Sequence, residues 1–201
     1  MLPIKSKYKI AKRLGAGIFE QTQTQKFALS EARSKKERRG GRGGSDFGRQ
    51  LLEKQRVRFT FGLSERQLSN YAEAAFEQKD PSAALHKSLE MRADSILYRA
   101  GFSTSRRAAR QATSHGHAMV NGVRITRPSH QLKKGDVIEI RQSAKKSPLY
   151  AGLAEQEEKR SAPAWLSADF SLLKIEVTGE PQYSQGETGL DYPTLFEFYS
   201  R

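Results

Sequence analysis

Cysteine and long apolar runs are both missing from this chain of 201 residues. Without cysteine the protein can form neither a disulfide nor a zinc site with thiolate ligands, and this fits a reducing compartment. No stretch of about 18 or more apolar residues occurs, so the sequence predicts no transmembrane helix and no membrane partner.

The motifs of common catalytic sites are missing too. The chain has neither a Gly-x4-Gly-Lys-Ser/Thr phosphate loop nor a Gly-x-Ser-x-Gly turn. His115 and His117 flank Gly116, and this spacing, with no carboxylate close in sequence, is not typical of metal ligands. Glu157 and Glu158 are expected on a solvated helix rather than in an apolar pocket. The sequence therefore predicts no enzyme, no cofactor, no metal and no small-molecule substrate.

Positive charge is present in excess and is unevenly distributed. The formal net charge is +13, with sixteen Lys and Arg against five Asp and Glu in residues 1–60, and twelve against three in residues 91–146. The intervening and C-terminal segments are slightly acidic. Two separate basic blocks indicate two surfaces that face a polyanion.

A basic helix is predicted over residues 105–115. Ser103 and Thr104, which precede it, are good N-cap residues, and Gly116 can take the left-handed conformation that ends a helix. Its apolar face consists of small residues, Ala108, Ala112 and to a lesser extent Ala109, so the helix can lie close to a neighbour. We expect its three guanidinium groups, those of Arg106, Arg107 and Arg110, to point outward.

A small antiparallel sheet is predicted after this helix. Asn121-Gly122 between short apolar runs is a strong hairpin signal, and a second turn at residues 133–136 leads into a strand at 137–140. Further strands are expected around residues 165–166 and 172–177.

Other helices are expected on both sides of this unit. The segment 45–62 is predicted to be a helix capped by Ser45 or Asp46. It would turn Leu51, Leu52, Gln55 and Phe59 inward and its cations outward. A capping box begins the next helix at Ser64. Residues 82–100 form one helix or two. We also expect a helix over 147–160 and a short terminal helix capped by Asp191.

The segment 34–44 has no apolar residue to bury and contains four glycines. It is predicted to be disordered when free and to become ordered against RNA, and a plain flexible linker is the alternative. The basic N-terminus could also be read as an organellar transit peptide, although it lacks the expected serine and arginine richness.

The middle of the chain resembles the S-four RNA-binding module, which is named after a protein of the small ribosomal subunit. The resemblance rests on the order and spacing of several short motifs. They are Arg92-Ala93-Asp94, Tyr98-Arg99-Ala100-Gly101-Phe102, Ser105-Arg106, Ala109-Arg110-Gln111, Ser114-His115-Gly116-His117 and Val120-Asn121-Gly122. Ala93 departs from the pattern, because the family usually carries Leu there.

The flanks resemble the ribosomal family itself, so that the likeness covers about residues 5–201. The segments that carry it are 45–62, 163–166 and 196–201. A pseudouridine synthase that carries the same module is an alternative, but only about 55 residues follow Lys146, too few for a catalytic domain. A stress protein that binds stalled large subunits is the third reading, and its usual form lacks the segment 45–62.

The resemblance implies an α+β fold with the RNA-binding domain inserted into a helical domain. We expect a basic N-terminal extension over residues 1–45 and a helical domain over 46–90 that is completed by 185–201. An α+β domain over 91–184 would contain the RNA-binding module at about 91–146.

The resemblance also implies a function in the cytoplasmic ribosome, with an organellar ribosome as the alternative. The protein would be a structural constituent of the small subunit and a primary binder of a multi-helix junction in the 5′ domain of 16S-type rRNA. It would nucleate assembly, contact small-subunit protein five, and contribute to mRNA entry and decoding accuracy.

Arginine suits such a surface, because its planar fork bridges phosphate oxygens or stacks on unpaired bases. The residues expected to bind rRNA are Lys9, Lys12, Arg13, Arg42, Arg49, Gln50, Lys54, Gln55, Arg56, Arg58, Arg92, Arg99, Ser105, Arg106, Arg107, Arg110, Gln111, Ser114, His115, His117, Asn121, Lys133 and Lys145.

Overall fold

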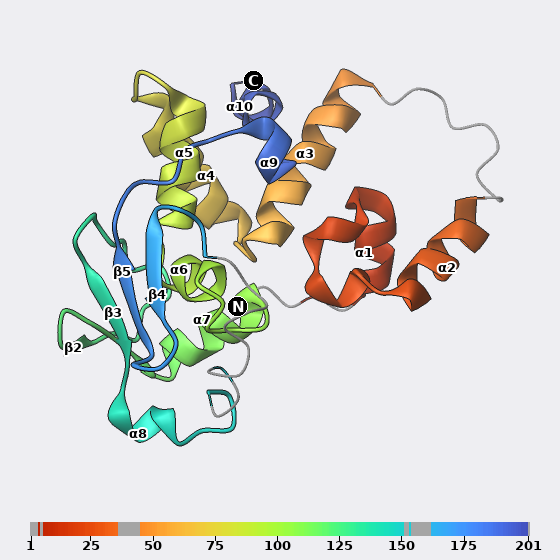
Figure 1. Cartoon of the computed structure of the whole chain (residues 1–201). Coiled ribbons are helices and arrows are strands. Elements are labelled where there is room, and N and C mark those ends of the chain that lie inside the picture. The colour runs from red at the N-terminus through yellow and green to blue at the C-terminus, as the bar shows by residue number, and fades with distance from the viewer. Residues whose placement is uncertain (1–3, 5, 36–44, 151–152, 154–161, 201) are drawn as a thin grey trace. The chain divides into compact units, whose positions relative to one another are not determined.

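A computed structural model describes residues 4, 6–35, 45–150, 153 and 162–200. Its contacts divide the chain into two compact units, one formed by Met1–Leu85 with Ser184–Arg201 and the other by His86–Tyr183. The expected domain boundaries, near residues 90 and 184, stay a prediction about folding domains. The α+β fold class is confirmed (Figure 1).

The first unit is helical. In chain order it contains α1 (Lys7–Leu14), two short 3-10 turns (Ala16–Ile18 and Glu20–Thr22), α2 (Gln25–Lys35), α3 (Asp46–Thr60), α4 (Glu65–Phe76), the first half of α5 (Pro81–Glu90), α9 (Gln185–Thr188) and α10 (Tyr192–Tyr199). The C-terminal α10 packs on α3 and α4, so the end of the chain completes a bundle begun by residues 46–76.

Caps at the starts of these helices follow the sequence prediction. Ser45 caps α3, the Ser64–Gln67 capping box begins α4, and the carboxylate of Asp191 accepts a hydrogen bond from the Thr194 amide at the start of α10. A cap satisfies amide groups that the first turn of a helix leaves without partners, so local sequence determines where a helix begins.

The second unit packs helices on a five-stranded antiparallel sheet. The helices are α6 (Ala93–Arg99), α7 (Arg106–Ser114) and α8 (Gln142–Lys145). The strands are β1 (Ala118–Val120), β2 (Val123–Arg124), β3 (Val137–Ile140), β4 (Leu166–Asp169) and β5 (Lys174–Val177). Their order in the sheet is β2-β1-β3-β5-β4.

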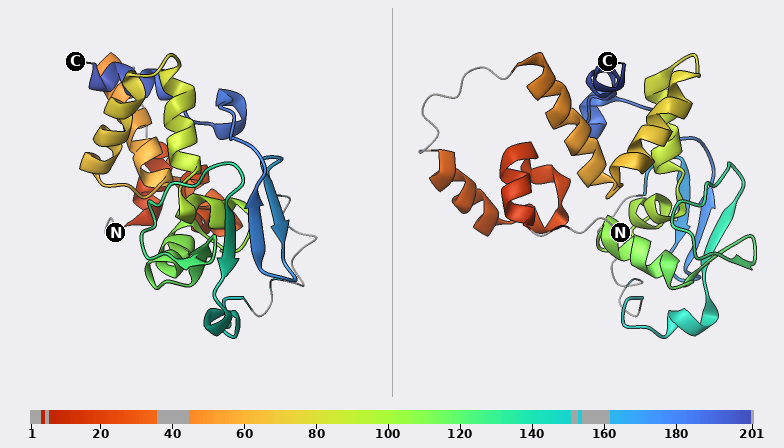
Figure 2. Two further views of the ribbon diagram at one scale, coloured as in Figure 1. Left: turned by 90° about the vertical axis from the view of Figure 1, so that its left-hand side faces the viewer. Right: turned by 180° about the vertical axis from the view of Figure 1, so that it is seen from behind.

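One face of the sheet forms the core of this unit. Alternate residues of β3 and β5, Ile138 and Ile140 with Ile175 and Val177, are buried, as the period of two along a strand requires. The same core includes Ile96, Leu97 and Ala109 from α6 and α7, which lie on one side of the sheet in Figures 1 and 2. Ala93 is also fully buried there.

The predicted hairpin is confirmed. Val120 pairs with Val123 across the turn, and Asn121 and Gly122 both have positive φ values, 48° and 80°. Two consecutive positive φ values characterise the type I′ turn, which matches the twist of the adjoining strands.

Two expectations about elements need correction. The fully buried line of α3 is Gln50, Lys54 and Val57, whereas Leu51, Leu52, Gln55 and Phe59 are only partly buried. Leu52 and Phe59 nevertheless pack, as predicted, against an apolar cluster that includes Ala11 and Phe27. Residues 148–150 form turns rather than the start of a helix, and most of the remainder of 147–160 lies outside the described residues. The short α8 was not predicted. The segment 34–44, which is predicted to become ordered against RNA, also lies mostly outside the described residues.

Candidate nucleic-acid interface

The basic helix α7 is bounded by its own sequence. The Ser105 side chain accepts a hydrogen bond from the Ala108 amide at 3.2 Å, and Gly116 beyond the other end has φ +72°. Ala109, Ala112 and Thr113 face the core. The buried face is therefore rotated from the predicted one, because Thr113 lies in it and Ala108 is only partly buried.

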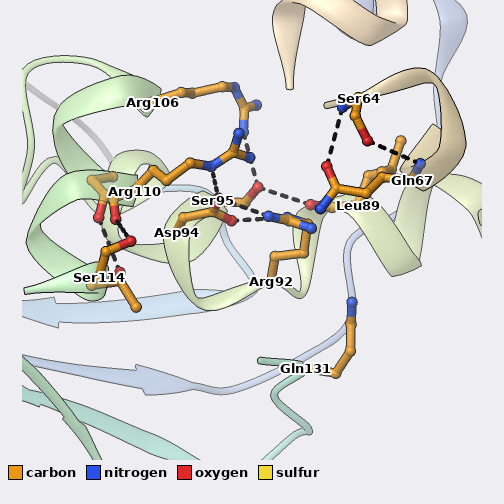
Figure 3. A network of polar contacts seen from close by, with 12 residues as sticks. Ser64, Gln67, Leu89, Arg92, Asp94, Ser95, Arg106, Arg110, Ser114 and Gln131 are labelled. Atoms are coloured by element: carbon orange, nitrogen blue, oxygen red, sulfur yellow. Dashed lines mark hydrogen bonds and ion pairs between the residues drawn. The ribbon is translucent and has the colours of Figure 1, made fainter. Parts of the chain in front are cut away.

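This rotation overturns the expectation that all three arginines of α7 point outward. The side chain of Arg106 is only 15% exposed and that of Arg110 only 14%. Both run back toward α6, where Arg106 reaches Ser95 and Arg110 reaches Asp94 (Figure 3). Of the three, only Arg107 is exposed.

Glu90 at the end of α5 is the first buried acceptor for these guanidinium groups. Its side chain is 1% exposed and receives two hydrogen bonds from Arg99, both at 2.8 Å, and one from Arg106 at 2.9 Å. Burial alone would raise the pKa of Glu90, but the charge of Arg106 and the hydrogen bond and charge of Arg99 outweigh it and lower the pKa to about 2. The carboxylate is therefore ionised at every physiological pH.

Asp94 in the first turn of α6 is the second buried acceptor. Arg92 donates to its two oxygens at 2.9 and 2.8 Å, and Arg110 donates to one of them at 2.8 Å. Arg92 is thus buried in an ion pair with Asp94, whereas it was predicted to bind rRNA at the surface. Forked pairs of this kind fix the plane of the guanidinium group as well as its distance.

The exposed side of α7 carries polar residues that lie on one stripe. Arg107, Gln111, Ser114 and His115 follow one another at intervals of four, three and one residues, and all four are exposed. We call this stripe the α7 outer face. It extends for about 12 Å at 1.5 Å per residue, which is long enough to lie along several phosphates.

Arg124 of β2 extends this face beyond the end of the helix. Its Nη2 donates to the carbonyl oxygen of His115 at 3.2 Å, at the C-terminal end of α7 where a positive charge is favourable. Gly116 has φ +72°, which favours glycine, and a Cβ atom there would displace the Arg124 guanidinium from its present position. Arg124 is not among the residues predicted from sequence to bind RNA, although its position on the second strand of the predicted hairpin, opposite Met119, could have indicated it.

Two other predicted contacts in this unit have structural partners. The imidazole of His117 lies 3.3 Å from the hydroxyl of Tyr150, and desolvation followed by the charge of His115 lowers the His117 pKa. Asn121 at the hairpin tip donates to Asp136 and accepts from the Val137 amide. Both side chains are therefore oriented by the fold before any ligand arrives.

The cations of α3 are also less available than predicted. Lys54 is only 9% exposed; its ammonium group lies 2.9 Å from Glu65 and 4.2 Å from the centre of the Phe198 ring. Arg58 lies 3.7 Å from the same carboxylate, and Arg56 lies 2.7 Å from Glu53. The prediction that these side chains face outward is wrong for Lys54, whereas Arg49 is exposed.

Further candidates differ in exposure. Gln50 is buried and donates to Glu197, and Gln55 accepts from Arg58. Lys145 donates to the Leu172 carbonyl oxygen. Lys9, Arg13 and Lys133 are exposed, Lys12 is half-buried, and Arg42 lies outside the described residues.

Within the described part of the chain, no group of three or more His, Asp or Glu side chains is arranged to hold a metal ion. Among those same residues, no helix has the length and apolar character needed to cross a bilayer.

Comparisons with known proteins agree with this architecture. A family model described as "S4 domain" matches residues 91–138. This range includes Asp94, the four arginines that bind the two buried carboxylates, α7 and the hairpin, and it begins one residue after Glu90. A second, described as "Ribosomal protein S4/S9 N-terminal domain", matches residues 4–91. The fold and the matched domain define an RNA-binding protein built around an S4 domain.

Curated relatives identify the family. A protein of Lachnospira eligens is 38% identical over 83% of this chain and 85% of its own length, and one of Chromobacterium violaceum is 37% identical over 97% of both. A Borrelia hermsii protein is 34% identical over 98% of this chain and 96% of its own length. All three are named small ribosomal subunit protein uS4. The chain belongs to this uS4 family of rRNA-binding ribosomal proteins.

Proposed function

We propose that this protein is a structural, non-catalytic constituent of the small ribosomal subunit that binds a multi-helix junction in the 5′ domain of 16S-type rRNA early in assembly. In the assembled subunit it would contact small-subunit protein five and contribute to mRNA entry and decoding accuracy. Its place would be the cytoplasmic ribosome.

The α7 outer face is the observation that carries this proposal. It offers a guanidinium, an amide, a hydroxyl and an imidazole on one side of a helix whose other side is held in a core. Folded RNA is recognised mainly through its shape, its phosphates and its 2′-hydroxyl groups, and such donors suit all three. Arg124 adds a second guanidinium at the end of the same face.

Charge that is not compensated supports the same proposal. Residues 91–146 contain twelve Lys and Arg against three Asp and Glu. The exposed Arg107, Arg124, Arg127 and Arg141 add to this excess.

A second surface in the helical unit would share the binding. Arg49 of α3 is exposed, as are Lys9 and Arg13 of α1. Each of these cations lies in the segment that matches the N-terminal family model. We propose that this unit contacts the RNA through these residues rather than through Lys54, Arg56 and Arg58. Arg49 also lies 3.6 Å from a carboxylate, that of Asp46, but its side chain is 65% exposed, whereas those of Lys54, Arg56 and Arg58 are 9%, 33% and 21% exposed.

The test is the salt dependence of binding between the full chain and an rRNA fragment that spans the junction. Neutralising phosphates releases counterions, so a protein with about four such contacts should lose about 100-fold in affinity between 50 and 200 mM salt. Filter binding across this range measures the slope. An affinity that does not change with salt would contradict the proposal.

A further inference from the structure

The buried carboxylates of Glu90 and Asp94 use guanidinium groups that a simple charge argument would leave for RNA. Arg106 illustrates the consequence. One of its terminal nitrogens donates to Glu90 and the other to the hydroxyl of Ser95, while its guanidinium carbon lies 4.8 Å from the centre of the Tyr98 ring. The Ser95 hydroxyl in turn donates to the Leu89 carbonyl oxygen at 2.8 Å. Arg106 is therefore fixed on several sides.

The two carboxylates together attach α7 to the elements before it. Glu90 at the end of α5 holds Arg106 in the first turn of α7, and Asp94 of α6 holds Arg110 one turn further on. Two ion pairs separated by one helical turn resist both sliding and rotation of α7. The remaining core contacts of α7 come from small side chains, Ala109, Ala112 and Thr113, which alone offer little shape to define a unique rotation.

Rotation of α7 decides what an RNA would meet. A turn of about 60° toward the arginines would bring Arg106 and Arg110 outward and move Gln111 and His115 away from the centre of the exposed side. The total charge of the protein would be the same in both arrangements. Only the spatial arrangement of hydrogen-bond donors on the protein surface would differ. That arrangement lets a protein distinguish a folded RNA from any other polyanion.

We propose that Glu90 and Asp94 are positioning residues for RNA recognition: by holding Arg99, Arg106 and Arg110 they set the orientation of α7 and so determine the preference for a folded junction over nonspecific RNA. The proposal rests on the RNA-binding function proposed above. It predicts that two negatively charged residues favour binding to a polyanion.

This prediction has the opposite sign from a pure charge effect. Removing an acidic residue makes the protein more basic, so charge alone would strengthen binding to every RNA. If the carboxylate acts through position, its removal should weaken binding to the junction and leave binding to an arbitrary duplex unchanged or stronger. The ratio of the two affinities therefore separates the two effects.

The experiment compares Glu90→Gln and Asp94→Asn with the unchanged full chain. Affinities are measured for the junction fragment and for an RNA duplex of equal length and unrelated sequence, at one salt concentration. We expect the junction-to-duplex ratio to fall about tenfold in each variant. Glu176→Gln is the matched control, because it removes the same charge from an exposed residue of β5, and its ratio should stay at the starting value.

Other outcomes are equally informative. If the junction-to-duplex ratio is unchanged in both Glu90→Gln and Asp94→Asn, the positioning role is overturned. The same conclusion follows if the affinities for junction and duplex rise equally in these variants, as expected for the control. An unchanged chain that shows no preference for the junction would instead contradict the proposed function.

If the Glu90 or Asp94 variant loses helical structure, as measured by circular dichroism, a second variant still tests the proposal. Arg110→Lys keeps the net charge but replaces the planar fork opposite Asp94 with a point charge. The proposal requires the ratio to fall in this variant while the helical signal persists. A normal ratio in a folded Arg110→Lys protein would overturn the role assigned to Asp94.

Discussion

Helices α3 and α7 both carry rows of cations, yet their acidic partners sit in different environments. In α7 the partners are Glu90 and Asp94, whose side chains are almost completely buried. In α3 the main partner is Glu65, which is half exposed and shared by Lys54, Arg58 and the hydroxyl of Tyr199. A buried ion that loses its partner is costly, whereas an exposed one is solvated by water. The same kind of ion pair therefore has a larger structural role in α7.

The largest effect is expected from removing both inward arginines of α7. Arg106→Ala combined with Arg110→Ala would leave Glu90 and Asp94 each with one remaining guanidinium partner in a buried setting. Breaking buried pairs typically costs about 3 to 5 kcal/mol each, and the remaining partners reduce this, so we expect a total loss of about 5 kcal/mol. Urea unfolding followed by circular dichroism measures it.

Arg107→Ala is the control on the same helix. It should change the free energy of unfolding by less than about 0.5 kcal/mol, as exposed substitutions usually do. If Arg107→Ala destabilises the protein as much as the double variant of Arg106 and Arg110 does, the distinction between the two faces of α7 is wrong.

A pH dependence of stability should follow from Glu90. Its folded pKa of about 2 lies below the ordinary value of 4.5, so its stabilising contribution is complete above about pH 4.5 and is lost as the pH falls toward 2. The difference between these two pKa values corresponds to about 3 kcal/mol. Unfolding measured at several pH values should show a smaller acid loss in Glu90→Gln than in the unchanged chain. Parallel pH profiles would refute this.

A smaller effect, on binding rather than folding, is expected from the α7 outer face. Arg107→Ala should weaken binding to the junction fragment by about 2 kcal/mol, or about 30-fold, the usual contribution of charge-assisted hydrogen bonds. Filter binding provides the measurement. Lys79→Ala removes the same charge from an exposed residue of the other unit, and binding equally weakened by that change would count against the outer face.

The smallest effect is expected in α3. Lys54→Ala removes an ion pair to a half-exposed carboxylate and a contact with the Phe198 ring, so the free energy of unfolding should fall by about 1 kcal/mol. Thermal or urea unfolding would show it. A loss as large as that of the α7 double variant would remove the contrast between the two helices.

Local features of the chain were predictable from sequence because their causes lie within a few residues. Gly116 follows the end of α7, Asn121-Gly122 forms the turn, and Asp191 caps the terminal helix. The N-cap of α7 is Ser105, one residue after the predicted Thr104. The motifs that resemble the S-four module were also sufficient to indicate the family that the comparisons then showed.

The predictions that needed correction depended on distant partners. Arg106 and Arg110 turn inward because Glu90 and Asp94, from the preceding two helices, lie against that side of α7. Lys54 turns inward because Glu65 and Phe198 meet it there, and Phe198 follows it by more than a hundred residues. A helical projection of α7 or α3 alone contains none of these groups.

The sequence by itself determined the elements, the turn, the basic character and the family, since capping, backbone conformation and net charge are short-range or additive properties. Only the tertiary structure decided which cations face the solvent. The direction in which an arginine points depends on the free energy of burying an ion with its partner, and that partner is brought near only when the chain folds.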